Sequence, residues 1–202
     1  VLPVLEERGI EALDLVILTH PHSDHYAGLT DVFGAVDVNE VWEDGVAADS
    51  SAYTYYYVEA RDATGADVLT PEVGYTKSFG EVTLEVLATA TGYSDVNNES
   101  LVVMLTYGGV RVLLTGDALA EEQGDLLDAN LASALEAQIL KVPHHGSYNF
   151  DDAFPTTVDP DYAVISCGDG NEYGHPHDEA LEAYDSVGAT ICRTDLLGDI
   201  EV

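Results

Sequence analysis

The stretch Leu18-Thr19-His20-Pro21-His22-Ser23-Asp24-His25-Tyr26-Ala27-Gly28 places three imidazoles and one carboxylate within six residues. It follows a short apolar run that predicts a strand and precedes a helical pattern. His20 and His22 lie two apart on an extended segment, so they project the same way and can hold one ion. Asp24 and His25 begin the next turn and can face a second ion. Imidazole with carboxylate is the usual ligand set for Zn²⁺, Mn²⁺ or Fe, so the stretch predicts a metal site.

Later segments add polar side chains at the ends of predicted strands. The strand Val110 to Leu114 is followed by Thr115-Gly116-Asp117, whose carboxylate can bridge two cations. Taken alone, Asp117 would be interpreted as the N-cap of the next helix. The strand Ile139 to Val142 leads to His144-His145, and adjacent histidines at a strand tip are costly unless they coordinate, transfer protons or hold anions.

A third strand tip offers His175 and His177 in the segment Asn171 to His177. We expect His175 to be functional and His177 to lie at the surface. The aromatic run Tyr53-Thr54-Tyr55-Tyr56-Tyr57 is open to two interpretations. Its four tyrosines either line a substrate cleft or pack a helix onto the sheet.

The remaining pattern predicts an α/β (α+β) protein with strands dominating the first half and alternating with helices later. A chain of 202 residues fits a single domain, 1–202. Hairpins are expected at Gly80-Glu81 and Gly108-Gly109. Further expected strands are Leu13 to Leu18, Val36 to Trp42, Val68 to Leu69, Tyr75 to Phe79, Val82 to Ala88, Leu101 to Thr106, Tyr162 to Cys167 and Ala189 to Arg193, and expected helices are Ser50 to Ala63, Glu121 to Gln138 and Asp178 to Val187.

The charge balance is extreme, with 38 acidic against 6 basic residues and a net charge of −32. A hydrophobic content of 46% excludes a disordered chain, which would pair high charge with few apolar residues. Such a surface repels itself until the Debye length falls to about 3 Å, near molar salt. We therefore predict a halophilic protein, with an ordinary acidic protein as the alternative. No basic groove for nucleic acid is visible, although molar salt screens phosphate repulsion and bound cations can supply positive charge.

No stretch approaches the roughly 18 uninterrupted apolar residues of a membrane span, so none is expected. The chain opens at Val1 rather than at methionine, which leaves a removed targeting segment open. Cys167 and Cys192 fall in strand-like runs, where buried free thiols are favoured over a disulfide.

These motifs resemble the metallo-β-lactamase superfamily and, within it, the hydrolase domain of ComEC-type DNA-uptake (competence) proteins. The histidine motif is typical of the superfamily, and the Asn-Ser-Leu, His-His-Gly-Ser and Gly-His-Pro signatures narrow the resemblance. It implies an αββα sandwich with metals at one edge. Besides the histidine motif, it rests on Asn97-Asn98-Glu99-Ser100-Leu101-Val102, Leu114-Thr115-Gly116-Asp117, Lys141-Val142-Pro143-His144-His145-Gly146-Ser147 and Tyr173-Gly174-His175-Pro176.

The sequence departs from this resemblance in two places. Where the superfamily has a further histidine ligand before the bridging aspartate, this chain has Asn98 and Ser100, as the ComEC-like branch does, and His144 is a candidate replacement. The hairpin and strand that open other members are absent. We therefore expect either an N-terminally truncated fragment or a sheet that lacks its opening strands and leaves an edge exposed.

The predicted activity is that of a metal-dependent hydrolase, most simply a phosphodiesterase or nuclease that cleaves DNA with a metal-bridged hydroxide. Two divalent metal ions, Zn²⁺ or Mn²⁺, are expected. One would be held by His20, His22 and either His144 or His175, the other by Asp24, His25 and the remaining late histidine, with Asp117 between them. The predicted catalytic residues are Asp24, Asn98, His145 and Ser147. His145, or whichever late histidine is not a ligand, would be the proton donor, and Ser147 would contact a phosphate oxygen.

Two other functions stay open. One is hydrolysis of a small ester, lactone or β-lactam, and the other is a metal-free binding module on the same fold. The expected partner is DNA or another phosphodiester. The resemblance favours an extracytoplasmic location over the cytoplasm of a high-salt organism.

Overall fold

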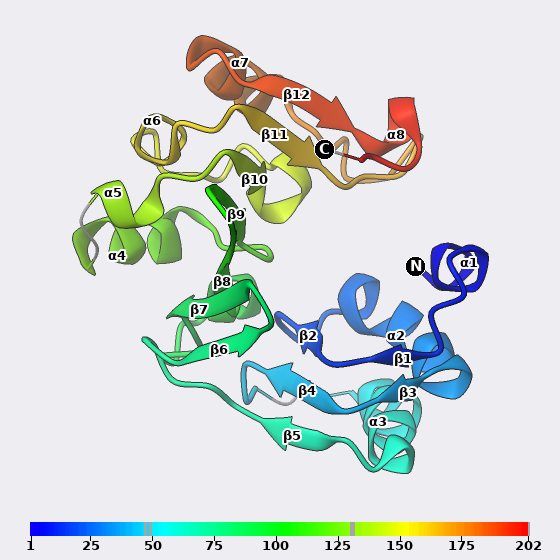
Figure 1. Ribbon diagram of the computed structural model, residues 1–202. Coiled ribbons are helices and arrows are strands. Elements are labelled where there is room, and N and C mark those ends of the chain that lie inside the picture. Colours follow the sequence, from blue (N-terminus) through cyan, green and yellow to red (C-terminus); the bar gives the residue numbers. More distant parts are fainter. Residues whose placement is uncertain (47, 49, 130–131, 202) are drawn as a thin grey trace. The chain divides into compact units, whose positions relative to one another are not determined.

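The computed structural model describes residues 1–46, 48, 50–129 and 132–201. The chain divides into two compact units (Figure 1). Unit 1 comprises Val1–Pro71 and Ala90–Leu101, and unit 2 comprises Glu72–Thr89 and Val102–Val202. Each unit contains both helices and strands, which confirms the mixed α/β class. The single domain predicted over residues 1–202 stays a prediction.

Unit 1 is built on short parallel strands. β2 (Val16–Leu18), β4 (Glu40–Glu43) and β5 (Asp67–Leu69) form one sheet in the order β2-β4-β5, and β1 (Ala12–Leu13) pairs with β3 (Asp37–Val38). Each of the first two predicted strands is therefore split in two. The breaks fall at Asp14 and Asn39, whose side chains hydrogen-bond to each other at 3.3 Å.

The helices of unit 1 supply much of its core. They are α1 (Leu2–Glu7), α2 (Ser23–Ala35), the π-helical η1 (Tyr53–Val58), α3 (Glu59–Thr64) and the 3₁₀ turn η2 (Val96–Glu99). Tyr53 and Tyr57 are buried and stack at 5.1 Å, whereas Tyr55 and Tyr56 are exposed. The packing interpretation of the aromatic run thus holds for two of its four tyrosines. The buried cluster comprises Val16, Leu18, Tyr26, Phe33, Val38, Val41, Tyr53 and Tyr57.

A buried acidic pair, Glu43 and Asp44, lies at the end of β4. Glu43 is compensated, because it accepts hydrogen bonds from Tyr57 Oη at 2.7 Å and from Arg61 Nη1 at 2.6 Å. Asp44 is only 2% exposed, and its Oδ1 accepts from the Val46 N–H at 3.0 Å. Its Oδ2 is buried without a hydrogen-bond partner among the described residues. Burial therefore raises the pKa of Asp44 to about 7, and the charges of Glu43 and Glu99 add to the increase.

Replacing Asp44 with asparagine should stabilise the protein at pH 8 and have little effect near pH 4. In the unfolded chain the pKa is near 3.8, so between about pH 4 and 7 the folded state holds the extra proton and the free energy of unfolding falls as pH rises. Above pH 7 the asparagine removes a buried charge, which we expect to be worth roughly 1–4 kcal/mol. Denaturant midpoints at the two pH values in constant molar salt measure this. An equal difference at both pH values would contradict it.

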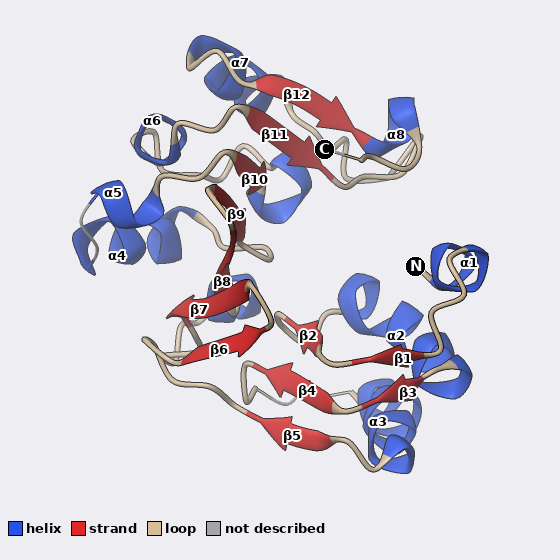
Figure 2. Ribbon diagram, viewed as in Figure 1, coloured by secondary structure: helices blue, strands red, loops and turns tan. Residues whose placement is uncertain are grey.

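Unit 2 contains one seven-stranded sheet in the order β12-β11-β10-β9-β8-β7-β6 (Figure 2). Its strands are β6 (Thr76–Phe79), β7 (Val82–Ala88), β8 (Val102–Tyr107), β9 (Val110–Leu114), β10 (Ile139–Lys141), β11 (Tyr162–Ile165) and β12 (Thr190–Arg193). Strands β6 to β9 are antiparallel and β9 to β12 are parallel. The two predicted hairpins are confirmed, with Gly80 and Gly108 in the left-handed conformation that such turns require.

The helices of unit 2 are α4 (Ala120–Ala129), α5 (Ala132–Leu135), the 3₁₀ turn η3 (Pro143–Gly146), α6 (Phe154–Val158), α7 (Asp178–Ser186) and α8 (Thr194–Leu197). The prediction of one helix from Glu121 to Gln138 is wrong at its C-terminal end, since α5 stops at Leu135. The Gln138 side chain instead accepts the Arg111 N–H at 2.9 Å and lies at the start of β10. Residues 130 and 131, within that predicted helix, lie outside the described residues.

The sheet of unit 2 carries its own core. Buried side chains include Leu113 on β9, Leu140 on β10, Ile165 on β11 and Phe154 on α6. Cys167 and Cys192 are both free, as predicted, but each is partly exposed rather than buried. Among the described residues, no helix is long and apolar enough to cross a membrane. Because β9, β10 and β11 are parallel, their carboxyl ends lie at the same edge of the sheet, and the residues that follow them are brought together there.

Candidate metal centre

The histidine motif of unit 1 occupies the turn from β2 into α2. His20 is fully buried, and His22 is the last extended residue before the helix (φ −82°, ψ 149°). His20 Nε2 lies 3.0 Å from His22 Nδ1. The His25 ring, one turn into the helix, lies 4.1 Å from the His20 ring. Three of the predicted ligands thus converge within unit 1.

Hydroxyl groups orient these rings. The Ser100 hydroxyl donates its hydrogen to the Asn97 carbonyl at 2.8 Å. In its second contact, 3.4 Å from His20 Nδ1, the hydroxyl can therefore only accept. Thr19 Oγ1 lies 3.2 Å from His20 Nδ1 and 3.4 Å from His25 Nδ1. The Ser100 contact makes Nδ1 the protonated nitrogen of His20, so its Nε2 carries the lone pair. The sequence interpretation missed Thr19 as a positioning residue, although its place directly before the first histidine was the available signal.

The other predicted residues of unit 1 differ in their surroundings. The Asp24 side chain is 60% exposed, and its Oδ2 lies 3.7 Å from His25 Nε2. Asn98 is buried in η2, two residues before Ser100. The position that lacks a histidine therefore holds a buried amide, and a hydroxyl that contacts His20. The catalytic role predicted for Asn98 stays a prediction.

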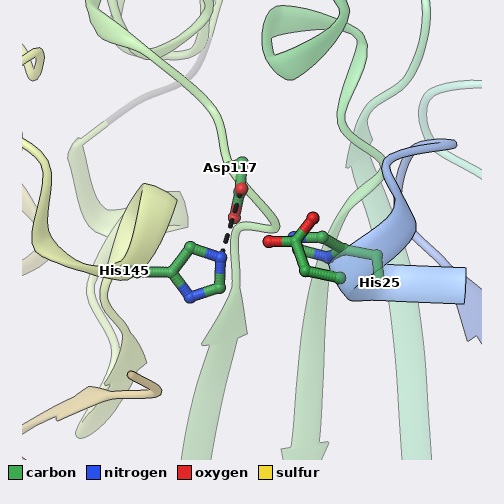
Figure 3. A group of neighbouring side chains, drawn as sticks. His25, Asp117 and His145 are labelled. Atoms are coloured by element: carbon green, nitrogen blue, oxygen red, sulfur yellow. Dashed lines mark ion pairs between the residues drawn. The ribbon is translucent and has the colours of Figure 1, made fainter. Parts of the chain in front are cut away.

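In unit 2, Asp117 follows β9 and faces His145 (Figure 3). Asp117 Oδ2 lies 3.4 Å from His145 Nε2, and Asp117 is 2% exposed. α4 begins only at Ala120, so Asp117 is not the residue that directly precedes this helix. The carboxylate is directed at an imidazole instead, which favours the site interpretation over the capping one.

The His144-His145-Gly146 segment has an unusual backbone. All three residues adopt positive φ, at 44°, 55° and 82°. For residues with a side chain this conformation costs on the order of 1–2 kcal/mol each, and such strain concentrates at functional sites. Backbone hydrogen bonds hold the turn in place, from His144 N to Gly116 O at 3.3 Å and from His177 N to Gly146 O at 2.9 Å. The turn therefore presents both histidines directly after β10, with the His145 imidazole facing Asp117.

Gly146 permits this turn. Replacing it with alanine should lower the free energy of unfolding. An added Cβ would lie 2.6 Å from Pro176 Cβ and 3.2 Å from Pro176 Cα, at a φ of +82°. We expect a loss of about 1–3 kcal/mol from the backbone strain alone. Denaturant midpoints would measure it, with Gly109→Ala as the control because no atom lies within 4 Å of a Cβ there. Equal midpoints for the two variants would refute the close-contact argument.

The protonation pattern of His145 follows from one contact. Its Nδ1 lies 2.6 Å from the Ser166 carbonyl oxygen, which can only accept, so Nδ1 carries the hydrogen. Nε2 of the neutral ring then presents its lone pair toward Asp117. A backbone carbonyl carries no sequence signal, and this contact could not have been predicted from the residue types.

His175 joins the same cluster in unit 2. Its ring lies 5.2 Å from that of His144 and 6.2 Å from that of His145. Burial, with the neighbouring His144, His177 and His145, lowers the pKa of His175 to about 4. The ring is therefore neutral at neutral pH, which is the form that coordinates a metal.

Asn171 positions this histidine, since its side chain donates to the His175 carbonyl at 2.6 Å and accepts the His175 N–H at 3.0 Å. The sequence interpretation assigned Asn171 no role.

The prediction that His177 lies at the surface is corrected by the structure. His177 is half-buried, and its ring lies 4.9 Å from that of His175. Ser147 ends the turn and accepts the Asn149 N–H at 3.2 Å.

The donor atoms within each unit fit divalent cations. Two nitrogens about 2.0–2.1 Å from one tetrahedral ion lie roughly 3.3 Å apart, close to the 3.0 Å between His20 Nε2 and His22 Nδ1. Each unit also holds an aspartate beside an imidazole Nε2, Asp24 with His25 and Asp117 with His145. Imidazole and carboxylate without thiolate suit Zn²⁺ and Mn²⁺ alike.

The chain is similar to known proteins over nearly its whole length. A family model described as "Metallo-beta-lactamase superfamily" matches residues 2–168. ComE operon protein 3 of Bacillus subtilis (strain 168) is 30% identical over 203 residues, which cover 99% of this chain and 26% of that protein. Competence protein ComA of Neisseria gonorrhoeae is 29% identical, over 100% of this chain and 27% of that protein. The chain thus spans about a quarter of the length of these curated relatives.

A solved structure shows the same fold. The metallo-beta-lactamase fold protein YhfI from Bacillus subtilis superposes with a TM-score of 0.54 at 14% identity, covering 90% of this chain and 74% of that chain. The similarity to ComE operon protein 3 and ComA confirms the resemblance to ComEC-type hydrolase domains that the motifs predicted. The chain belongs to the metallo-β-lactamase superfamily.

Proposed function

We propose that this chain is a metal-dependent phosphodiesterase that cleaves DNA. The observation that carries the proposal is the grouping of His20, His22 and His25 in unit 1, together with Asp117 facing His145 in unit 2. The family match over residues 2–168 includes all of these residues, which supports a common function for them. Relatives named for competence and for recombination support DNA as that substrate.

The proposed ligands are the residues that the motifs predict. In unit 1 they would be His20, His22, Asp24 and His25. In unit 2 they would be Asp117 with His144 and His175. When bound, divalent cations lower the pKa of a coordinated water and stabilise charge on the phosphoryl oxygens. Thr19, Ser100 and Asn171 would keep the imidazole ligands in place, as such outer contacts do in other metal sites.

His145 is the proposed proton donor. Since the Ser166 carbonyl holds its Nδ1–H, a second proton can reside only on Nε2, beside the Asp117 carboxylate. That carboxylate stabilises the imidazolium form, and Nε2–H can then be transferred to the leaving oxygen. Ser147 would contact a phosphate oxygen, and Asn98 would line the site.

The experiment that tests the proposal compares two reaction classes. Hydrolysis of bis-p-nitrophenyl phosphate and of a chromogenic β-lactam is measured in about 2–3 M KCl, where the Debye length is short enough to screen a charge of −32, with added Mn²⁺. We expect the phosphodiester to be cleaved in preference. Activity on the lactam alone would replace the proposal with a small-molecule hydrolase, and a chain that binds no stoichiometric metal would favour a binding module.

A further inference from the structure

Three aromatic rings form a stack that leads outward from His145. The rings of His145 and His175 are 6.2 Å apart and inclined by only 18°. The rings of His175 and Tyr173 follow at 5.8 Å and 25°. Tyr173 ends the stack with 78% of its surface exposed. A nearly parallel series of rings therefore runs, within unit 2, from the proposed proton donor to an exposed phenol.

A second exposed ring lies on the same cluster. Tyr148 is 65% exposed and packs edge-on against His177 at 4.9 Å, and His177 in turn contacts His175 at 4.9 Å. Tyr148 follows the left-handed turn that carries His144 and His145, and Tyr173 precedes His175 by two residues. The histidine cluster of unit 2 is thus bordered by two tyrosine rings that leave much of their surface to solvent.

The basic side chains of unit 2 are engaged in contacts within the protein and do not form a phosphate-binding surface for a nucleic acid. Arg111 donates to the Ser133 and Ala134 carbonyls, and Arg193 pairs with Asp195. Lys141 donates to the Val142 carbonyl at 2.8 Å, and Lys77 Nζ lies over the Phe79 ring, 5.4 Å from its centroid. In a chain of charge −32, a ligand that carries phosphates needs attraction of another kind. Aromatic rings supply it by stacking on the faces of nucleobases, an interaction that does not depend on charge.

We propose that Tyr173, supported by Tyr148, is a nucleobase-binding site that holds single-stranded DNA beside the His145–His175 cluster. The exposed face of Tyr173 would continue the series of rings with a base, which would hold the strand at the outer side of the histidine cluster. A paired base has both faces covered by its neighbours in the duplex, so the site selects single strands or frayed ends. The inference deepens the proposed function and rests on it for the nature of the ligand.

The test measures binding and cleavage separately. Fluorescence anisotropy gives the Kd for a labelled oligothymidylate and for a tetrahydrofuran abasic strand of the same length and charge, in about 2 M KCl with Mn²⁺. We expect the protein to bind the base-bearing strand about tenfold more tightly. Tyr173→Ala should abolish that preference, and Tyr173→Phe should retain it because the ring remains. Tyr107→Ala, which removes a 55% exposed tyrosine at the end of β8, is the matched control.

The outcomes separate the two proposals. Equal Kd values for the two strands, or a preference that survives Tyr173→Ala, would overturn the base-binding site even if both strands are cleaved. A base preference that depends on Tyr173, found together with no metal-dependent cleavage, would support the base-binding site and overturn the phosphodiesterase. Because Tyr173 is so exposed, its variants should unfold at the same temperature as the parent, which thermal unfolding checks.

Discussion

Replacing Asp117 with asparagine should reduce kcat/KM for a phosphodiester by about 10³-fold or more. Asp117 follows β9, is buried, and directs Oδ2 at His145 Nε2 from 3.4 Å. The substitution keeps the shape of the side chain but removes the charge proposed to bind a cation, whose catalytic contribution is several kcal/mol. Steady-state kinetics with bis-p-nitrophenyl phosphate, accompanied by metal analysis of the purified protein, measure the change.

The matched control is Asp128→Asn, which removes the same charge from an exposed position on α4. It should leave kcat/KM and metal content unchanged. A variant with asparagine at position 117 that binds full metal and retains full activity would remove Asp117 from the centre.

Replacing His145 with alanine should lower kcat by about 10²- to 10⁴-fold on DNA while metal content stays full, because a general acid contributes on this scale. The effect should be much smaller on bis-p-nitrophenyl phosphate, since p-nitrophenolate leaves readily without a proton. The Ser166 contact to Nδ1 predicts this behaviour, because it leaves Nε2 as the nitrogen that exchanges protons. Single-turnover rates on the two substrates give the comparison.

The same pair of substrates distinguishes a proton donor from a ligand. If His145 instead coordinates a cation, metal content falls in the alanine variant and both substrates slow alike. His144→Ala and His175→Ala provide the reference for loss of a ligand, since these two residues are the proposed ligands of unit 2 besides Asp117. If the His145 variant loses metal as these two variants do, His145 is a ligand, and His144 or His175 becomes the candidate proton donor.

Local patterns in the sequence predicted most of the strands. The hairpins at Gly80 and Gly108 could be predicted because glycine adopts the positive φ of a tight turn without strain. The breaks at Asp14 and Asn39 were not, since they depend on a hydrogen bond between side chains far apart in sequence. The end of α5 at Leu135 was missed because Gln138 makes contacts with β9 and β11 that no helical periodicity encodes.

In the candidate site, too, local sequence patterns were predictable and features that depend on tertiary contacts were not. Residue type and spacing identified His20, His22 and His25, and the structure brings their rings together in unit 1. The left-handed conformation of His144 and His145 was not predictable, because residues with a side chain adopt it only when surrounding contacts impose it. The Ser166 carbonyl, which sets the tautomer of His145, belongs to the backbone and has no signature at all.

The most direct measurement of the central claim is cleavage of single- and double-stranded DNA in about 2–3 M KCl, where charge repulsion is screened. Reactions contain Mn²⁺, Zn²⁺ or EDTA, and His22→Ala serves as the control. We predict cleavage that requires the metal, is suppressed by EDTA and is lost in the His22 variant. A protein that binds stoichiometric metal yet cleaves neither form of DNA would contradict the assignment as a nuclease.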